Sequence, residues 1–142
     1  MSNQENAWSL NLVTAEALWL PVVSEDPPAS FPKRKAKLTY EDPRTGKRIE
    51  WNPMKNSEQA FKLILPFSLR LAYWTNTTKD RFVSAHQEWN SGNSEWDWKY
   101  VLIDPREPDA ALRKAICQAV AYIHRNPRSF FNGGQRPPYS GV

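Results

Sequence analysis

The sequence has one cysteine and two histidines in 142 residues, and this scarcity limits the chemistry of the chain. Cys117 cannot form an intrachain disulfide, and by itself it cannot supply a thiolate metal cluster. Neither His86 nor His124 has a Cys, His or acidic neighbour at a metal-ligand spacing. We therefore expect stability from packing alone, no metal site and no cofactor.

The sequence also has no long hydrophobic run, and its first residues do not have the pattern expected of a secretory leader. Its most hydrophobic window, 61–74, is too short for a bilayer span and is interrupted by Lys62, Pro66 and Arg70. No cationic segment followed by an apolar core opens the chain. These features predict a cytoplasmic protein that has no membrane partner.

Catalytic signatures are missing as well. The sequence contains no Walker loop, dinucleotide fingerprint, Gly-x-Ser-x-Gly elbow or zinc-protease helix motif. Cys117 follows Ile116 inside an expected helix, which favours a small buried apolar group over a nucleophile paired with His86. Acidic pairs such as Glu95 with Asp97 suit turns and helix caps. We expect a protein that is not an enzyme.

The aromatic content, by contrast, is high: 7 Trp, 5 Tyr and 6 Phe in a chain whose residues are 40% apolar. Side chains of this size bury enough area for a hydrophobic core, and the length suits one domain. We expect a flexible N-terminus over 1–7, a single α+β domain over 8–127 and an extended C-terminal tail over 128–142, which contains Gly133-Gly134 and Pro137-Pro138.

Two hairpins are expected to form a small antiparallel sheet. The first, about 37–51, joins two short β-prone runs through a turn in which Pro43 and Gly46 suit tight geometry. The second, about 81–103, joins the runs 81–89 and 95–103 through a loop rich in Asn, Ser and Gly.

A C-terminal amphipathic helix, about 108–125, is expected to pack on this sheet. Its apolar residues recur at spacings of three and four, which places them on one face. The helix begins either with a capping box of Asp104 and Glu107 or with Pro108 as its first residue, and Pro127 should end it. The side chains expected to be buried against the strand 95–103 are Leu112, Ile116, Val120 and Ile123.

A short helix is expected near 57–65. Asn56 can cap it while Gln59 reaches back to the cap's backbone amide, and Pro66 limits its length. Two other segments have open assignments: 8–23 has features of both strand and helix, and 67–75 suits a strand or a kinked helix. At the end of the first of these segments and after it, Pro21, Pro27, Pro28 and Pro32 predict a surface loop.

The main functional hypothesis comes from the uneven charge of the chain. The segment 33–55 holds eight basic and three acidic residues, a net charge of +5 in a chain whose net charge is +4. Clustered cations can contact phosphates while neighbouring rings stack on bases, although a charged hairpin can also simply solvate a sheet. We therefore predict a non-enzymatic binding protein in a nucleic-acid-associated complex, with contacts from Lys33, Arg34, Lys35, Lys37, Tyr40, Arg44, Lys47, Arg48 and Trp51.

The alternative hypothesis is a protein-binding adaptor, inhibitor or assembly subunit that has no nucleic-acid contact. Large rings near the second hairpin loop, Trp89, Trp96 and Trp98, suit either a binding hot spot or packing against the C-terminal helix. The tail combines aromatic residues with a stiff proline pair, as docking peptides do, or it packs on its own domain. The partner-binding residues of this alternative are Trp89, Phe130, Phe131 and Tyr139.

Overall fold

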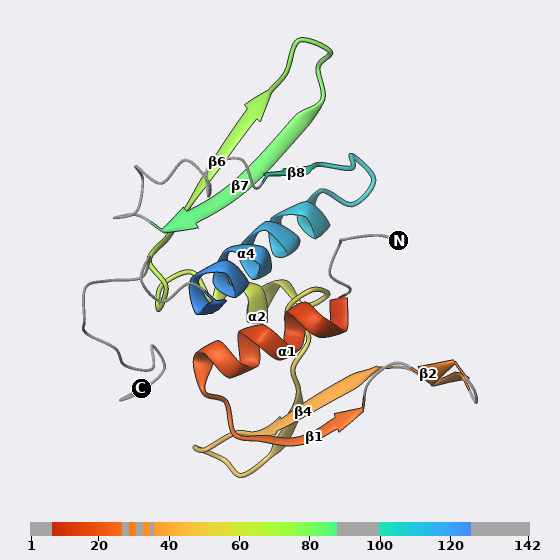
Figure 1. Ribbon diagram of the computed structural model, residues 1–142, viewed down its shortest axis with the longest axis vertical. Coiled ribbons are helices and arrows are strands. Elements are labelled where there is room, and N and C mark those ends of the chain that lie inside the picture. The colour runs from red at the N-terminus through yellow and green to blue at the C-terminus, as the bar shows by residue number, and fades with distance from the viewer. Residues whose placement is uncertain (1–6, 27–28, 31–32, 35, 88–99, 126–142) are drawn as a thin grey trace.

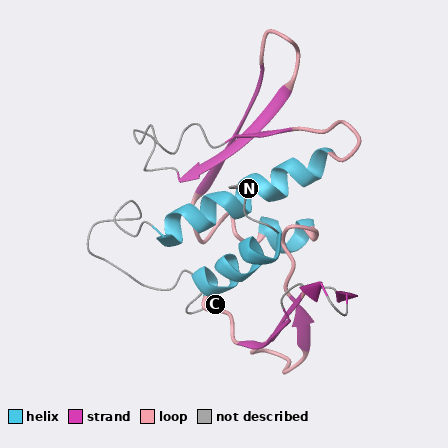
Figure 2. Cartoon of the chain, turned by 45° about the vertical axis from the view of Figure 1, so that its right-hand side comes forward, coloured by secondary structure: helices cyan, strands magenta, loops and turns pink. Residues whose placement is uncertain are grey.

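Two small antiparallel sheets lie on opposite sides of a layer of helices in the computed structural model (Figures 1 and 2). The structure describes residues 7–26, 29–30, 33–34, 36–87 and 100–125. Within these ranges the helices are α1 (Ala7–Leu18), α2 (Ser57–Phe61) and α4 (Pro108–Arg125). The first sheet has the strand order β1 (Val22–Asp26), β4 (Lys37–Glu41), β5 (Arg48–Glu50). The second sheet has the order β6 (Leu69–Thr75), β7 (Arg81–Gln87), β8 (Tyr100–Leu102). A further short pair joins β2 (Ala29–Ser30) to β3 (Lys33–Arg34).

The α+β class is confirmed, and both expected hairpins are antiparallel pairs. They belong to different sheets, however, rather than to one. The helices α1 and α4 pack on each other, α1 contacts β4, and α4 contacts β7 and β8. Each hairpin thus buries its apolar side against the helical layer, which separates the two sheets.

The first sheet alternates buried and exposed side chains, as the sequence predicts. Leu38 and Tyr40 of β4 are buried, whereas Lys37 and Glu41 are exposed. Where β4 pairs with β5, Tyr40 lies opposite Ile49. One face of this sheet therefore packs towards α1 and the other faces solvent.

The prediction of a surface loop for the stretch that contains Pro21, Pro27, Pro28 and Pro32 is wrong for its first part, Val22–Asp26. Val22–Asp26 forms the edge strand β1, which pairs antiparallel with β4 and has a register shift between Val22 and Ser24. Pro21 lies directly before the strand, where proline removes no ladder hydrogen bond. The β-branched pair at the start of β1 then favours extended backbone.

Both open assignments are settled. The chain is helical from Ala7 to Leu18, and this helix ends where Trp19 adopts a left-handed φ of 59° and the Leu20 amide donates to the Ala15 carbonyl at 3.0 Å. The later segment is the strand β6, which starts at Leu69 after a positive φ at Ser68. The strand interpretation of that segment is therefore confirmed from Leu69 onward.

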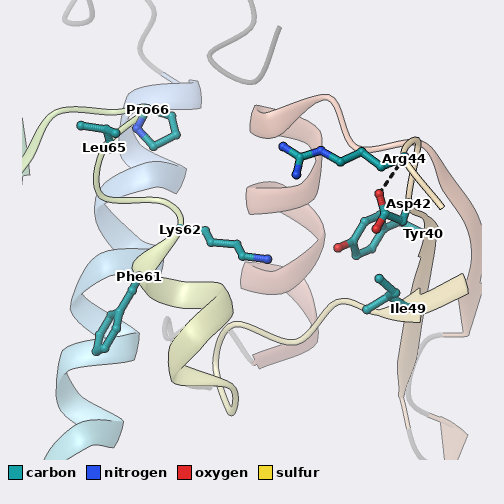
Figure 3. A pocket seen from close by; sticks show the side chains of 8 residues that line it. All are labelled: Tyr40, Asp42, Arg44, Ile49, Phe61, Lys62, Leu65 and Pro66. Carbon is teal, nitrogen blue, oxygen red and sulfur yellow. Dashed lines mark hydrogen bonds between the residues drawn. The ribbon is translucent and has the colours of Figure 1, made fainter. Parts of the chain in front are cut away.

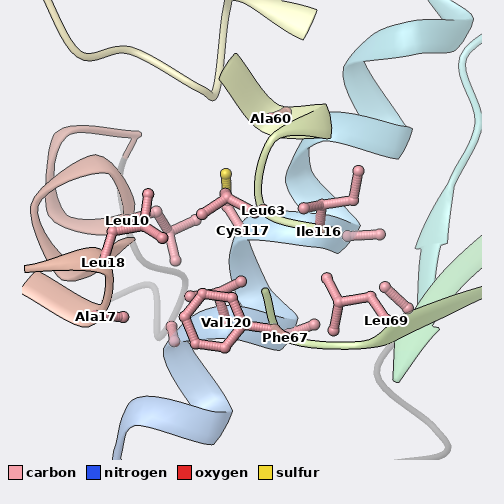
Figure 4. Close-up of a cluster of buried hydrophobic side chains, with 14 of the residues drawn as sticks. Leu10, Ala17, Leu18, Ala60, Leu63, Phe67, Leu69, Ile116, Cys117 and Val120 are labelled. Carbon is pink, nitrogen blue, oxygen red and sulfur yellow. The ribbon is translucent and has the colours of Figure 1, made fainter. Parts of the chain in front are cut away.

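The C-terminal helix occupies the expected range and carries the centre of the core (Figure 4). Ile116, Val120 and Ile123 are buried as predicted, whereas Leu112 is only half-buried near one end of the helix. Pro108 is the first helical residue, and the Asp104 carboxylate accepts a hydrogen bond from the Arg106 amide at 2.9 Å, which closes a turn before the helix. Residues 95–99 and 126–127 lie outside the described part of the chain.

Helix α2 is shorter than the expected 57–65: beyond Phe61, the Leu63 and Ile64 amides donate to carbonyls three residues earlier, so the chain continues as tighter turns up to Pro66. Asn56 caps it as predicted, accepting from the Gln59 amide at 3.1 Å. The prediction that the Gln59 side chain accepts a hydrogen bond from the Asn56 amide is wrong, because that amide donates to the Asn52 carbonyl. That side chain accepts from the Asn52 amide at 2.6 Å and donates to the Glu50 carbonyl at 2.8 Å, so it fastens the chain that leaves β5.

Candidate functional site

The outer face of the first sheet does not concentrate positive charge. Lys37 lies opposite Asp26 of β1, and Arg48 lies opposite Glu41 of β4. Cross-strand neighbours of opposite sign stabilise a solvated sheet face. The basic residues expected on these strands are therefore interleaved with carboxylates, and the cationic part of the hairpin lies at its turn.

The two rings expected to stack on bases are part of the core. Tyr40 is only 7% exposed and Trp51 only 2% exposed, and their rings pack edge to face with centroids 5.9 Å apart. The Trp51 indole Nε1 also donates to Thr14 Oγ1 at 3.0 Å. Because base stacking requires an accessible ring face, we do not retain these two residues as contacts.

The turn between β4 and β5 is organised by Asp42. Its carboxylate accepts a hydrogen bond from the Arg44 amide at 2.9 Å, and its carbonyl accepts one from the Gly46 amide at 2.7 Å. Gly46 has a φ of 75°, a conformation that favours glycine. This arrangement leaves the side chains of Arg44 and Lys47 exposed at the tip of the hairpin.

A cavity of about 550 Å³ opens beside this turn. The hairpin forms one wall, and the other wall is the segment that ends α2 and leads into β6. In Figure 3, Lys62 and Arg44 extend towards the gap from opposite walls, whereas the Phe61 and Leu65 side chains point away from the hairpin. The residues that line the cavity are Tyr40, Asp42, Arg44, Ile49, Phe61, Lys62, Leu65 and Pro66.

The charged side chains that line this cavity are two cations, Arg44 and Lys62, and one carboxylate, Asp42. Among the described residues, neither Arg44 nor Lys62 forms an ion pair. The only carboxylate in the lining, Asp42, already accepts a hydrogen bond from a backbone amide. With two cations and one carboxylate, the lining has a net charge of +1, and a phosphate or carboxylate oxygen in the gap could accept hydrogen bonds from both Arg44 and Lys62.

Sequence reasoning missed Lys62, which it treated as an interruption of the most hydrophobic window. Its sequence signal is nonetheless simple: a lysine between the buried Ala60 and Leu63 must direct its ammonium group to solvent. The sequence does not show that the chain folds back to place this lysine opposite Arg44.

None of the other predicted contacts is among the described residues that line this cavity. Lys33 and Arg34 form β3, which pairs with β2. Five predicted contacts lie outside the described residues: Lys35, Trp89, Phe130, Phe131 and Tyr139.

Features that would indicate a reaction centre or a membrane segment are not seen in the described ranges. There, no group of three or more His, Cys, Asp or Glu residues is placed to hold a metal ion, and no helix is long and apolar enough to cross a membrane. Cys117 is buried, and burial raises the pKa of its thiol to about 12. Comparison of the chain with protein-family models, curated proteins and solved structures finds no match.

Proposed function

We propose that this chain is a non-enzymatic binding protein that acts in a nucleic-acid-associated complex and contacts backbone phosphates at the cavity beside the β4–β5 turn. Arg44 and Lys62 are the principal contacts, and Lys47 lies nearby on the same turn. The observation that carries the proposal is the placement of two cations, unpaired within the described chain, on opposite walls of one open cavity.

The two cations differ in what they offer a phosphate. The Arg44 guanidinium can donate two parallel hydrogen bonds, whereas the Lys62 ammonium is a compact point charge. A phosphate between them would accept from both walls and would tie the turn to the segment after α2. Such contacts supply affinity and register without reading sequence.

The proposal is tested by titrating fluorescein-labelled single- and double-stranded DNA and RNA over a series of salt concentrations. Counterion release makes affinity fall as salt rises, with a log–log slope of about 0.7 to 0.9 per phosphate contact. The double variant Arg44→Ser/Lys62→Ser should therefore bind more weakly and lose about 1.4 to 1.8 from this slope.

The matched control removes the same formal charge elsewhere. Lys55 and Lys79 are exposed and lie outside the cavity lining, and Asn tolerates the φ of 71° at position 79. Lys55→Ser/Lys79→Asn should change the slope little. Equal losses in the two double variants, or no detectable binding of the unmodified protein at low salt, would reject the proposed contacts.

A protein-binding adaptor is the second candidate, and exposed apolar side chains favour it. Leu65 beside the cavity is 86% exposed, and Trp19 after α1 is 67% exposed. An interface built on such residues depends weakly on salt. Capture of a partner from the native host that is unaffected by nuclease and by moderate salt would favour this candidate over phosphate binding.

A further inference from the structure

The cavity beside the β4–β5 turn combines three kinds of side-chain chemistry. Arg44 and Lys62 are exposed cationic donors, and neither side chain has a hydrogen-bond or ion-pair partner among the described residues. Asp42 supplies a carboxylate acceptor. The apolar part of the lining consists of Ile49, Phe61, Leu65 and Pro66.

The Asp42 carboxylate has acceptor capacity left for a ligand. Its Oδ1 accepts one hydrogen bond, from the Arg44 amide at 2.9 Å. An ionised carboxylate has roughly four lone-pair sites, and in the described chain this one forms no ion pair with a lysine or arginine. Asp42 can therefore hold the turn and still accept a hydrogen bond from a hydroxyl or amine of a ligand.

The cavity also has the size of a small-ligand site. Its volume is about 550 Å³, and sites for small molecules occupy roughly 300–1,000 Å³ and combine an apolar lining with a few polar groups. Inorganic phosphate would use only the two cations. A nucleotide would use the whole lining, because its ribose hydroxyls and exocyclic amines are donors for a carboxylate and its base is a flat body for the apolar wall.

We infer that this cavity binds one nucleotide by its terminal phosphate, either as a free nucleoside 5′-monophosphate or as the 5′ end of a strand. This inference rests on the proposed function for the location and the class of ligand. It narrows the ligand from any backbone phosphate to a phosphate monoester that carries a nucleoside.

Charge favours a terminal phosphate over an internal one. A phosphate monoester carries about −1.5 to −2 at neutral pH, whereas a backbone diester carries a single negative charge. Arg44 and Lys62 extend towards the gap from opposite walls (Figure 3). A monoester supplies enough negative charge for both cations, and a diester supplies one charge for the two.

The first test uses the unmodified full chain and three internally labelled oligoriboadenylates of one length: linear with a 5′-phosphate, linear with a 5′-hydroxyl and covalently closed. Fluorescence anisotropy should show about 10- to 150-fold tighter binding of the phosphorylated strand than of the other two, the effect of a hydrogen bond to a charged group. Calorimetry with adenosine 5′-monophosphate distinguishes the source. Binding of this nucleotide without a preference for the phosphorylated strand assigns the site to the free nucleotide, and absence of both effects overturns the inference.

The second test examines the nucleoside contact. Asp42→Asn keeps an oxygen that can accept from the Arg44 amide and removes the negative charge. The ratio of the affinity for adenosine 5′-monophosphate to that for inorganic phosphate should fall about 10- to 150-fold in this variant. The affinity for inorganic phosphate should not fall, because a like charge has been removed from the lining.

The matched control is Glu41→Gln, which removes the same charge from an exposed neighbour outside the cavity lining. This variant should keep the ratio of the unmodified protein. An unchanged ratio in Asp42→Asn, or an equal fall in the two variants, would overturn the contact between Asp42 and the nucleoside.

The two proposals fail separately. If the closed strand binds as tightly as the phosphorylated one, adenosine 5′-monophosphate does not bind and Arg44→Ser/Lys62→Ser weakens both strands equally, the cavity binds internal phosphates and only this inference is rejected. If the nucleotide binds and no strand does, the nucleic-acid-associated function is rejected and the nucleotide site stands. No binding of any of these ligands to the unmodified protein rejects both.

Discussion

The Trp51 indole Nε1 donates a hydrogen bond to Thr14 Oγ1 at 3.0 Å, and both residues are buried. The same hydroxyl donates to the Asn11 carbonyl at 2.8 Å within α1. One threonine side chain therefore links the end of the β4–β5 hairpin to the helix that covers it. Since this hairpin bears the turn with Arg44, the link also fixes one wall of the candidate site.

Thr14→Val should lower the free energy of unfolding by about 1–3 kcal/mol, because it leaves the buried Trp51 N–H without an acceptor while keeping the shape of the side chain. Denaturant unfolding measures the change. In a double-mutant cycle with Trp51→Phe, the double variant should lose less than the sum of the single losses. Strictly additive losses would mean that the hydrogen bond contributes nothing.

Ile116→Ala should cost about 2–5 kcal/mol of stability, because the side chain is fully buried where α1, α2 and α4 meet the second sheet (Figure 4). Leu112→Ala is the matched control on the same helix. Leu112 is half-buried, so its truncation should cost clearly less. Equal costs for the two variants would contradict the burial described here.

Gln59→Ala should cost about 1–3 kcal/mol, since its amide satisfies the Asn52 N–H and the Glu50 carbonyl at the end of β5. The neighbouring Glu58 is exposed, and Glu58→Ala should change stability by less than about 0.5 kcal/mol. Thermal unfolding of both variants measures the difference. A loss in Gln59→Ala no larger than that in Glu58→Ala would show that the amide bonds are dispensable.

Local patterns predicted most of the elements. The turn residues of the first hairpin, the loop residues of the second, the spacing of Ile116, Val120 and Ile123, and the cap at Asn56 each depend on neighbours within a few residues. The division into two sheets does not, because it results from the packing of α1 between α4 and β4. Val22–Asp26 was missed because its strand is defined by pairing with β4 rather than by its own polar sequence.

The candidate site was predictable only in part. The charge count of 33–55 indicated a basic hairpin, and the turn residues Arg44 and Lys47 are exposed as expected. The count could not show that Asp26 and Glu41 lie opposite Lys37 and Arg48, because cross-strand register is a property of the folded sheet. Lys62 follows α2 and comes to the cavity only because the folded chain packs this segment beside the β4–β5 turn, so sequence alone did not place it there.

Cys117 provides a test of both the core and the proposed function. The thiol is buried, and burial raises its pKa from an ordinary value of 9.0 to about 12. Above pH 9 the unfolded chain therefore releases a proton that the folded chain keeps, so stability falls as the pH rises towards 12. Between pH 8 and pH 10 this linkage corresponds to a loss of about 1.4 kcal/mol.

Cys117→Ala removes this titration, so the unmodified protein should lose about 1.4 kcal/mol more than the variant between pH 8 and pH 10. The comparison cancels the titration of lysines and tyrosines that both proteins share. Denaturant unfolding at the two pH values measures it, and parallel pH profiles would mean that the thiol is solvated in the folded state.

The Cys117→Ala variant should also bind oligonucleotides as the unmodified protein does at pH 7, since Cys117 lies in the core and is absent from the cavity lining. Complete loss of binding in a folded Cys117→Ala protein would instead assign the thiol a functional role.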